Sequence, residues 1–453
     1  MKRTMPATLL GYSLSTLLAA GAGGAAALDL EGLSPMEELG ALIFFDETLS
    51  IRQNQACASC HVPEVGWVGE DPEINLGGAV YEGSRRNKLG NRKPPSSAYA
   101  TQSPVFHLDD VLGFTGGNFW DGRATGWTLG SPSAEQAQGP FLNPVEQALP
   151  DAACVVNRVC EGEYGDLFRQ VWSGQNCAIK WPANTFGQCN SPTGSVRLSA
   201  EDRERVASAY DQIAYSIAAF EASKASNAFT AKVDAVRAGE ADFTDEERLG
   251  QSLFTATGKG KCAVCHRGSP PDGPSPLFSD FGYDNLGVPK NPLNPVLLDD
   301  PGWADPGLGG FLATLETTVP EYAALAEDNL GKHKVPTTRN VALGSCEAAE
   351  PGEPCIEKAY MHNGYFKTLK QVVKFYNTRD VWPRCEELET PIYDATADVA
   401  MDNECWPAPE VEKNVVAPDN VEGDLVGNLG LSDEEEDALV ALMKAMSDGY
   451  WVE

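Results

Sequence analysis

Basic residues are scarce in this chain, which has 34 Lys and Arg against 65 Asp and Glu and a formal net charge of −31. A surface of that sign repels phosphate backbones, so the composition argues against nucleic acid as a partner. The acidic excess suits a basic protein partner or a saline habitat, and it would also serve solubility alone.

Long apolar runs are missing beyond the first residues. Leu9–Ala20 is apolar, but it is short and rich in Gly and Ala, which argues against a membrane span. Lys2 and Arg3 precede it and Ala25–Ala27 offers a small-residue cleavage site, so residues 1–27 are predicted to be a signal peptide. We therefore expect an exported, periplasmic protein that does not span a membrane.

Strand patterns are also scarce, and the predicted fold class is all-α with long loops. The clearest helical pattern covers 201–236, with Val206, Ile213 and Phe220 on one face. A second amphipathic helix is predicted over 432–446, opened by its own capping box.

Two copies of the motif C-x-x-C-H are present. Their residues are Cys57, Cys60 and His61 in the first copy, and Cys262, Cys265 and His266 in the second. Two thiols at this spacing form thioethers with the vinyl groups of one haem, and the adjacent His supplies an axial nitrogen to iron. The predicted cofactors are therefore two covalently bound haem c groups. A thioredoxin-like dithiol would need a βαβ pattern, and a shared zinc site would leave both histidines unexplained.

The segment before each motif is duplicated as well. Ser34 and Thr244 each stand three residues before a Glu, the pattern of a capping box, and Leu-Gly and Phe follow in both helices. This duplication predicts two cytochrome c-like haem domains, at residues 28–238 and 239–453.

The other eight cysteines form an even set in a chain expected to be exported, which indicates disulfides that staple the long loops. Pairing between sequence neighbours would give Cys154–Cys160, Cys177–Cys189, Cys346–Cys355 and Cys385–Cys405. The sequence leaves the connectivity open.

Five further segments carry motifs. They are Phe119–Arg123, Glu135–Pro140, Asn143–Glu146, Lys334–Val341 and Tyr360–Gly364. With the two haem motifs in this order, the chain resembles the bacterial dihaem cytochrome c peroxidase family, and within it the MauG-like branch that includes MbnH-like dihaem enzymes. The resemblance covers nearly the whole chain after the signal peptide.

The resemblance makes His61 the proximal ligand of the peroxide-reactive haem. Relatives that oxidise cytochromes often place a distal His at the position of Gly77, and no His lies nearby here, so the distal face is expected to be open. His107 is the one rival ligand in this half of the chain, and a surface or supporting role suits it better.

The resemblance also implies three catalytic residues. Glu146 and Gln136 match the distal pocket, where a carboxylate moves a proton from the inner to the outer peroxide oxygen and an amide orients the peroxide. Trp120 matches the tryptophan between the two haems, where an oxidisable indole lets electrons cross in two short hops. A tryptophan of an all-α core otherwise serves packing.

For the second haem the resemblance implies His266 as proximal ligand and Tyr376 as distal ligand, where cytochrome-oxidising relatives carry a Met. A thioether favours reduced iron, whereas a phenolate favours oxidised iron and suits a store of oxidising equivalents. Met361 lies beside His362, but its place in the motif is not that of the ligand.

Calcium and two insertions complete the expectations. The family's calcium site makes Asn91 the best candidate ligand for one calcium ion. Cys-bearing insertions at 345–357 and 152–190 depart from the family pattern, and the second is expected to shape a surface for a protein partner.

Three functions are compatible with these residues. The favoured one is a MauG-like enzyme that uses hydrogen peroxide to form a bis-ferryl state, which oxidises a residue, expected to be Trp, on a partner protein. The alternative is a periplasmic cytochrome c peroxidase that takes electrons from a small cytochrome or copper protein. The third is a non-enzymatic electron carrier. Tyr376 and the open distal face favour the first.

Overall fold

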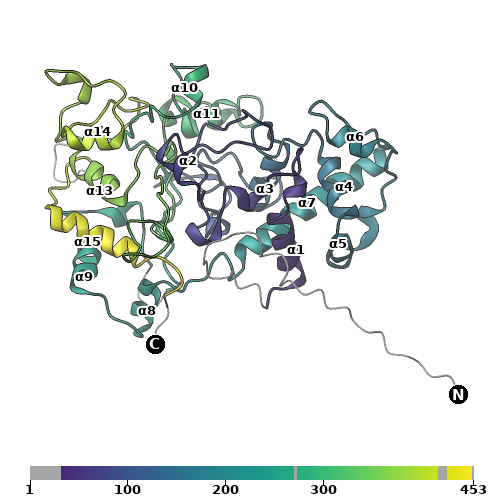
Figure 1. Cartoon of the computed structure of the whole chain (residues 1–453), viewed down its shortest axis with the longest axis horizontal. Coiled ribbons are helices and arrows are strands. Elements are labelled where there is room, and N and C mark those ends of the chain that lie inside the picture. The colour runs from purple at the N-terminus through teal and green to yellow at the C-terminus, as the bar shows by residue number, and fades with distance from the viewer. Residues whose placement is uncertain (1–31, 270–272, 417–425, 451–453) are drawn as a thin grey trace.

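The computed structural model describes residues 32–269, 273–416 and 426–450, so the predicted signal peptide lies outside the described residues. The helices are α1 (Pro35–Phe44), α2 (Pro72–Leu76), α3 (Pro132–Leu142), α4 (Ala152–Glu161), α5 (Gly165–Trp172), α6 (Thr185–Cys189), α7 (Ala200–Ala222), α8 (Lys232–Ala238), α9 (Asp245–Thr255), α10 (Val296–Asp299), α11 (Gly307–Ala313), α12 (Pro320–Ala323), α13 (Leu369–Thr378), α14 (Ala397–Asp402) and α15 (Asp433–Lys444). Helices α4, α5 and α6 occupy one end of the molecule, and α13, α14 and α15 occupy the other (Figure 1). In these ranges no helix is both long and apolar enough to cross a membrane.

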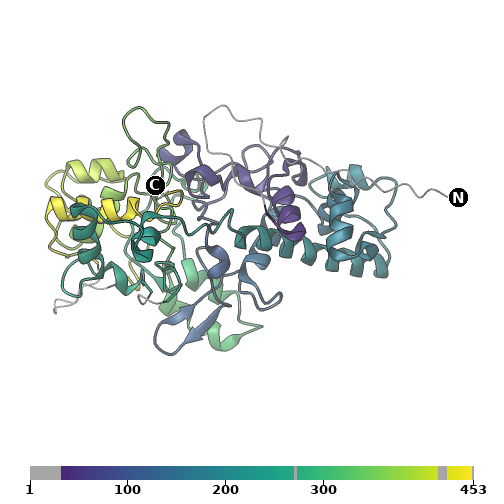
Figure 2. The ribbon, with the colours of Figure 1, turned by 90° about the horizontal axis from the view of Figure 1, so that it is seen from below.

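Strands form two short antiparallel pairs within the described ranges. These are β1 (His107–Asp109) with β2 (Gly113–Thr115), and β3 (Tyr283–Asp284) with β4 (His333–Lys334). The hairpin of β1 and β2 projects from one side of the molecule, close to the α11 region (Figure 2). The prediction of a mostly helical fold is confirmed, with these few strands added.

Two large apolar cores follow one another along the chain. The first joins α1, α3, α4 and α7 and extends from Leu39 to Phe220, and the second joins α9, α13 and α15 and extends from Ala231 to Met446. Val233, which precedes the predicted domain boundary, already belongs to the second core. The division into two cytochrome c-like domains with the bounds given above stays a prediction.

A glycine at the same place in each half lets two helices cross closely. A Cβ atom on Gly40 of α1 would clash with the backbone of Ser216 in α7, and one on Gly250 of α9 would clash with the backbone of Ala438 in α15. Both α1 and α9 begin with the predicted capping boxes. The duplicated Leu-Gly pattern therefore corresponds to a duplicated helix crossing. In each half the haem motif follows this crossing after a short stretch of chain.

The single helix predicted over 201–236 is wrong at residues 223–231, which separate two helices. Helix α7 ends at Ala222, and α8 starts only at Lys232. In the segment between them, the Asn227 side-chain oxygen accepts a hydrogen bond from the Tyr99 backbone N–H at 2.6 Å. Tertiary contacts with the first half therefore outweigh the helical pattern here.

The disulfide prediction is half confirmed. The confirmed pairs are Cys346–Cys355 and Cys385–Cys405. The other two predicted pairs are wrong, because the bonds are Cys154–Cys189 and Cys160–Cys177. Cys154 and Cys160 lie on the same helix, α4. A rise of 1.5 Å per residue separates them by about 9 Å along its axis, which is too far for a disulfide.

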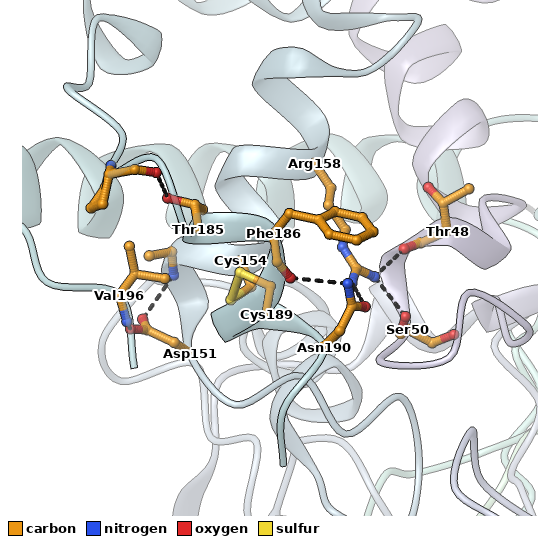
Figure 3. Close-up of a disulfide and its surroundings, with 12 residues drawn as sticks. Thr48, Ser50, Asp151, Cys154, Arg158, Thr185, Phe186, Cys189, Asn190 and Val196 are labelled. Atoms are coloured by element: carbon orange, nitrogen blue, oxygen red, sulfur yellow. Dashed lines mark hydrogen bonds between the residues drawn. A yellow bond between two sulfur atoms is a disulfide. The ribbon is translucent and has the colours of Figure 1, made fainter. Parts of the chain in front are cut away.

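The Cys154–Cys189 bond joins α4 to α6, as Figure 3 shows. Beside it the Arg158 guanidinium donates to the backbone carbonyl of Ser50 at 2.6 Å and to the side-chain oxygen of Asn190 at 3.1 Å. The disulfide closes the 152–190 insertion on itself, and the Arg158 guanidinium joins the insertion to the loop that follows α1. Its role in binding a partner stays a prediction.

Candidate functional site

All four cysteines of the C-x-x-C-H motifs are free, whereas the other eight form disulfides. Cys57–Ser59 and Cys262–Val264 each form one 3₁₀ turn. Side chains three residues apart point the same way in such a turn. The turns therefore present both thiols of each motif to one ligand.

The two motif histidines have the same orientation. The Nδ1 atom of His61 lies 3.1 Å from the backbone oxygen of Trp67, and that of His266 lies 3.0 Å from the backbone oxygen of Phe278. Burial lowers the pKa of His61 to about 4 and also lowers the pKa of His266. Both rings are thus neutral, which is the form that binds a metal.

Each motif faces a mainly apolar cavity, of about 220 Å³ for the first and about 190 Å³ for the second. Paired free thiols, a neutral imidazole and apolar walls are the donor set and surroundings of a covalently bound haem. The residues present therefore fit one haem c group at each motif.

Two buried lysines, Lys93 and Lys358, and the half-buried Lys334 line the first cavity, and none of them has a carboxylate partner among the described residues. Burial lowers the pKa of Lys93 to about 8 and the pKa values of Lys334 and Lys358 to about 7. A buried ammonium without an anion is costly. The carboxylates of a haem would supply the missing negative charge, which is a second reason why the group fits.

Glu146 and Gln136 line the first cavity together with His61. Gln136 lies on α3, and Glu146 follows in a turn in which its backbone N–H donates to the Asn143 carbonyl at 3.0 Å. The Asn143 amide donates to Glu146 Oε2 at 2.8 Å. Burial raises the pKa of Glu146, although this hydrogen bond and the charge of Arg123 oppose the rise. A carboxyl group in such a place can exchange a proton with a ligand in the cavity.

Trp120 lines both cavities and is 8 % exposed. Its indole N–H donates to the Lys93 carbonyl at 2.8 Å, and its own carbonyl accepts from the Lys334 backbone N–H at 2.9 Å. Its ring centroid lies 6.4 Å from that of His362. The structure thus brings the third predicted catalytic residue to the wall that the two cavities share.

Tyr376, on α13, lines the second cavity together with His266. Burial raises the pKa of the Tyr376 hydroxyl, and the nearby Cys265 and Cys262 thiols raise it further. A phenolate in this cavity consequently needs a cation beside it, which a ferric ion would provide. Met361 lines both cavities, so a thioether is also within the walls of this site.

A buried network at the edge of the second cavity escaped the sequence reasoning. His362 Nε2 lies 2.9 Å from Glu410 Oε2, and the ring of His333 stacks on that of His362 with 3.5 Å between centroids. Asp305 lies 3.4 Å from His333 Nε2 and accepts two hydrogen bonds from Arg92. These residues come from segments that are far apart in the sequence and share no motif, so only their common place at the cavity edge reveals them.

The network does not form a metal site of its own. Ligand atoms of Asp305, His333 and His362 lie within 4.8 Å of one another. The two imidazole planes are stacked with an angle of only 10°, so one ion could not lie in the plane of both rings. The cluster therefore belongs to the edge of the haem cavity.

The remaining predicted residues lie away from the two cavities. His107 is exposed in β1 and lines neither cavity, which confirms its surface role. Gly77 caps the end of α2, and His61 is the only imidazole among the described residues that line the first cavity. Asn91 is exposed, and its carbonyl accepts a hydrogen bond from Asn294 at 2.9 Å. The calcium site stays a prediction.

Comparison with known proteins agrees with this geometry. A family model described as di-haem cytochrome c peroxidase matches residues 34–242. The methylamine utilization protein MauG of Paracoccus denitrificans is 31 % identical over 90 % of this chain and 88 % of its own length. The cytochrome c551 peroxidase of Nitrosomonas europaea is 24 % identical over 83 % of this chain and 84 % of its own length.

A solved structure extends the likeness to three dimensions. The diheme peroxidase BthA of Burkholderia thailandensis superposes with a TM-score of 0.65 and 26 % sequence identity, covering 92 % of this chain and 89 % of that one. The chain therefore belongs to the di-haem cytochrome c peroxidase family that includes MauG, and it is a haem-dependent peroxidase with two haem c groups.

Proposed function

We propose that the protein uses hydrogen peroxide to oxidise a residue, foremost a Trp, on a partner protein in the periplasm. The observation that carries this proposal is the phenol of Tyr376 in the wall of the second cavity. A phenolate ligand stabilises oxidised iron, so this site would hold an oxidising equivalent and would be hard to reduce. The first cavity complements it, because no second imidazole among its described lining residues would close the peroxide position.

The residues around the first cavity have separate tasks in this proposal. His61 and His266 would hold the two irons, and haem would supply the redox chemistry when bound. Glu146 would accept a proton from one peroxide oxygen and return it to the other, which would then leave as water. Gln136 orients the peroxide through its amide.

Trp120 joins the two sites. Its indole lies in the shared wall and its N–H is held by the Lys93 carbonyl, so the ring has one fixed orientation toward both cavities. By giving up an electron to one side and taking one from the other, it would share the two oxidising equivalents of peroxide between both sites.

A second candidate function is reduction of peroxide with electrons from a small cytochrome or copper protein. It is favoured by the thioether of Met361, which lines the second cavity and would make that haem easier to reduce if it replaced Tyr376. Calcium bound near Asn91 would belong to either function.

One experiment separates the two. Stoichiometric peroxide is added to the fully ferric holoprotein, and visible and near-infrared spectra are recorded. A long-lived oxidised species with a near-infrared charge-resonance band supports partner oxidation. Reactivity that appears only after one-electron reduction supports the second function, and indifference to peroxide in both states refutes both.

A further inference from the structure

A line of aromatic rings runs from the second cavity across α13. Tyr376 lines the cavity, and its ring centroid lies 6.3 Å from that of Phe375, its neighbour on the helix. Phe375 packs edge-on against Trp406 with 5.2 Å between centroids. Trp406 in turn stacks on Trp382 at 5.5 Å and an interplanar angle of 22°. No step in the line exceeds 6.3 Å.

The two tryptophans differ in exposure. Trp406 is 2 % exposed, whereas Trp382 is half-buried and follows Val381, which is 56 % exposed. The pair therefore leads from the core of the second half to the surface. Within the described chain it is the only stacked pair of tryptophans.

A disulfide and backbone hydrogen bonds hold the two tryptophans in place in addition to their packing. The Cys385–Cys405 disulfide closes the loop between the two rings, and the Cys385 backbone N–H donates to the Trp406 carbonyl at 3.0 Å. The Trp382 backbone N–H donates to the carbonyl of Thr378, the last residue of α13, at 2.9 Å. Both indoles are thus tied to the helix that carries Tyr376.

The hydrogen bonds of the buried Trp406 indole determine whether its proton moves together with an electron. Trp406 Nε1–H donates to Thr378 Oγ1 at 3.0 Å, and this hydroxyl donates its own hydrogen to the Lys374 carbonyl at 2.7 Å. The Thr378 oxygen is a weak base, so the indole proton stays in place when an electron leaves. The outer indole borders solvent, which can take up its proton.

We infer that Trp406 and Trp382 form an electron relay between the second haem site and the protein surface. Two electrons, one at a time, pass from Trp382 through Trp406 to the oxidised second site, and a donor at the surface refills Trp382. The peroxide takes up these two electrons and two protons and becomes two water molecules. The inference rests on the proposed peroxide chemistry, and it names the place where a partner's oxidisable group docks.

Without an external donor, the oxidised second site would oxidise Trp382 itself, and this modification provides the test. Trp382 would lose two electrons and two protons and take up one water molecule, giving hydroxytryptophan. Ferric holoenzyme is treated with peroxide, its spectra are recorded, and peptide mass spectrometry then measures oxidation at each tryptophan. The wild type is compared with Trp406→Phe and with the control Trp181→Phe, whose half-buried indole lies against the first core.

We expect the peroxide-induced spectra to be alike in all three proteins, and oxidation of Trp382 to be present in the wild type and control but lost in Trp406→Phe. Equal oxidation of Trp382 in Trp406→Phe would overturn the relay. If no protein responds to peroxide, the proposed peroxide chemistry fails and the inference falls with it.

A surface variant covers the case in which Trp406→Phe does not fold. Trp382→Phe changes a half-buried ring. It is expected to move the oxidation inward to Trp406 and to lengthen the lifetime of the oxidised holoenzyme. An unchanged lifetime together with an unmodified Trp406 would contradict the inference.

Discussion

At the scale of single residues, the chemistry of this protein depends on a few side chains whose neighbours are supplied by distant loops. The resemblance to the dihaem peroxidases implied Glu146 and Tyr376, and both lie in cavity walls. The sequence could not predict the stack of His333 on His362 or the contact of His362 with Glu410, because no local pattern links these three segments.

Replacing Glu146 by Gln tests its role in moving the proton. The amide cannot accept the peroxide proton, so the rate of the peroxide reaction should fall by about 10²- to 10⁴-fold. In the wild type the rate should decrease as the pH falls through the raised pKa of Glu146, since only the carboxylate accepts a proton. Stopped-flow absorbance over a pH series measures both effects.

Glu221 provides the matched control. It lines the same cavity, and burial raises its pKa to about 8, but it has no part in the proposed proton transfer. Glu221→Gln should leave the peroxide rate near that of the wild type. A fall in both variants alike would show that cavity charge, rather than proton transfer by Glu146, controls the rate.

Replacing Tyr376 tests the ligand at the second site. Tyr376→Met should raise the reduction potential of one haem and leave the other unchanged, because a thioether favours reduced iron. Tyr376→Phe should alter the electron paramagnetic resonance signal of the same haem. Potentiometric titration with these spectra measures both, and signals identical to wild type in both variants would exclude Tyr376 as a ligand.

At the scale of elements, the sequence predicted helix starts better than helix ends and loop pairings. The Ser34 and Thr244 caps were predicted because a capping box is local. The break after Ala222 and the pairing of Cys154 with Cys189 depend on contacts far apart in sequence. Considering where helix α4 places its two cysteines would have excluded the wrong bond.

The duplicated helix crossing leads to a prediction about glycine. Gly40→Ala and Gly250→Ala should each lower the free energy of unfolding by about 1–3 kcal/mol, because the new methyl group meets backbone across the crossing. Gly187→Ala in α6 is the control, since a Cβ there meets nothing within 4 Å. It should be neutral or stabilising by up to about 1 kcal/mol. Urea unfolding followed by circular dichroism compares the three, and equal effects would refute the packing argument.

At the scale of the whole molecule, the two haem cavities are completed by both halves of the chain. Lys334, in the second half, lines the first cavity, and Trp120, in the first half, lines the second. The Lys93 backbone N–H also donates to the His362 carbonyl at 2.8 Å across the halves. The duplication in the sequence predicted two haem sites, but it could not predict that each half builds part of the other's wall.

The net charge of −31 predicts salt-dependent association. The rate at which the peroxide-oxidised enzyme oxidises a basic cytochrome should fall steeply as ionic strength rises, because the screening length shrinks from about 8 Å at 0.15 M to about 3 Å at 1 M. Stopped-flow kinetics over a salt series measures this rate, with an uncharged phenolic donor as control. A rate that is insensitive to salt for the basic donor would exclude electrostatic steering.

The order of the cysteines in the 152–190 insertion has a consequence for biogenesis. The Cys160–Cys177 bond lies inside the loop closed by Cys154–Cys189. In an exported chain Cys154 would emerge first among the cysteines of this insertion and would have to wait for Cys189, the last of them. An oxidase that joins thiols in the order in which they emerge would link Cys154 to Cys160, which is not a native pair. The protein should therefore need thiol–disulfide exchange by an isomerase to mature, and a host without one should accumulate scrambled chains.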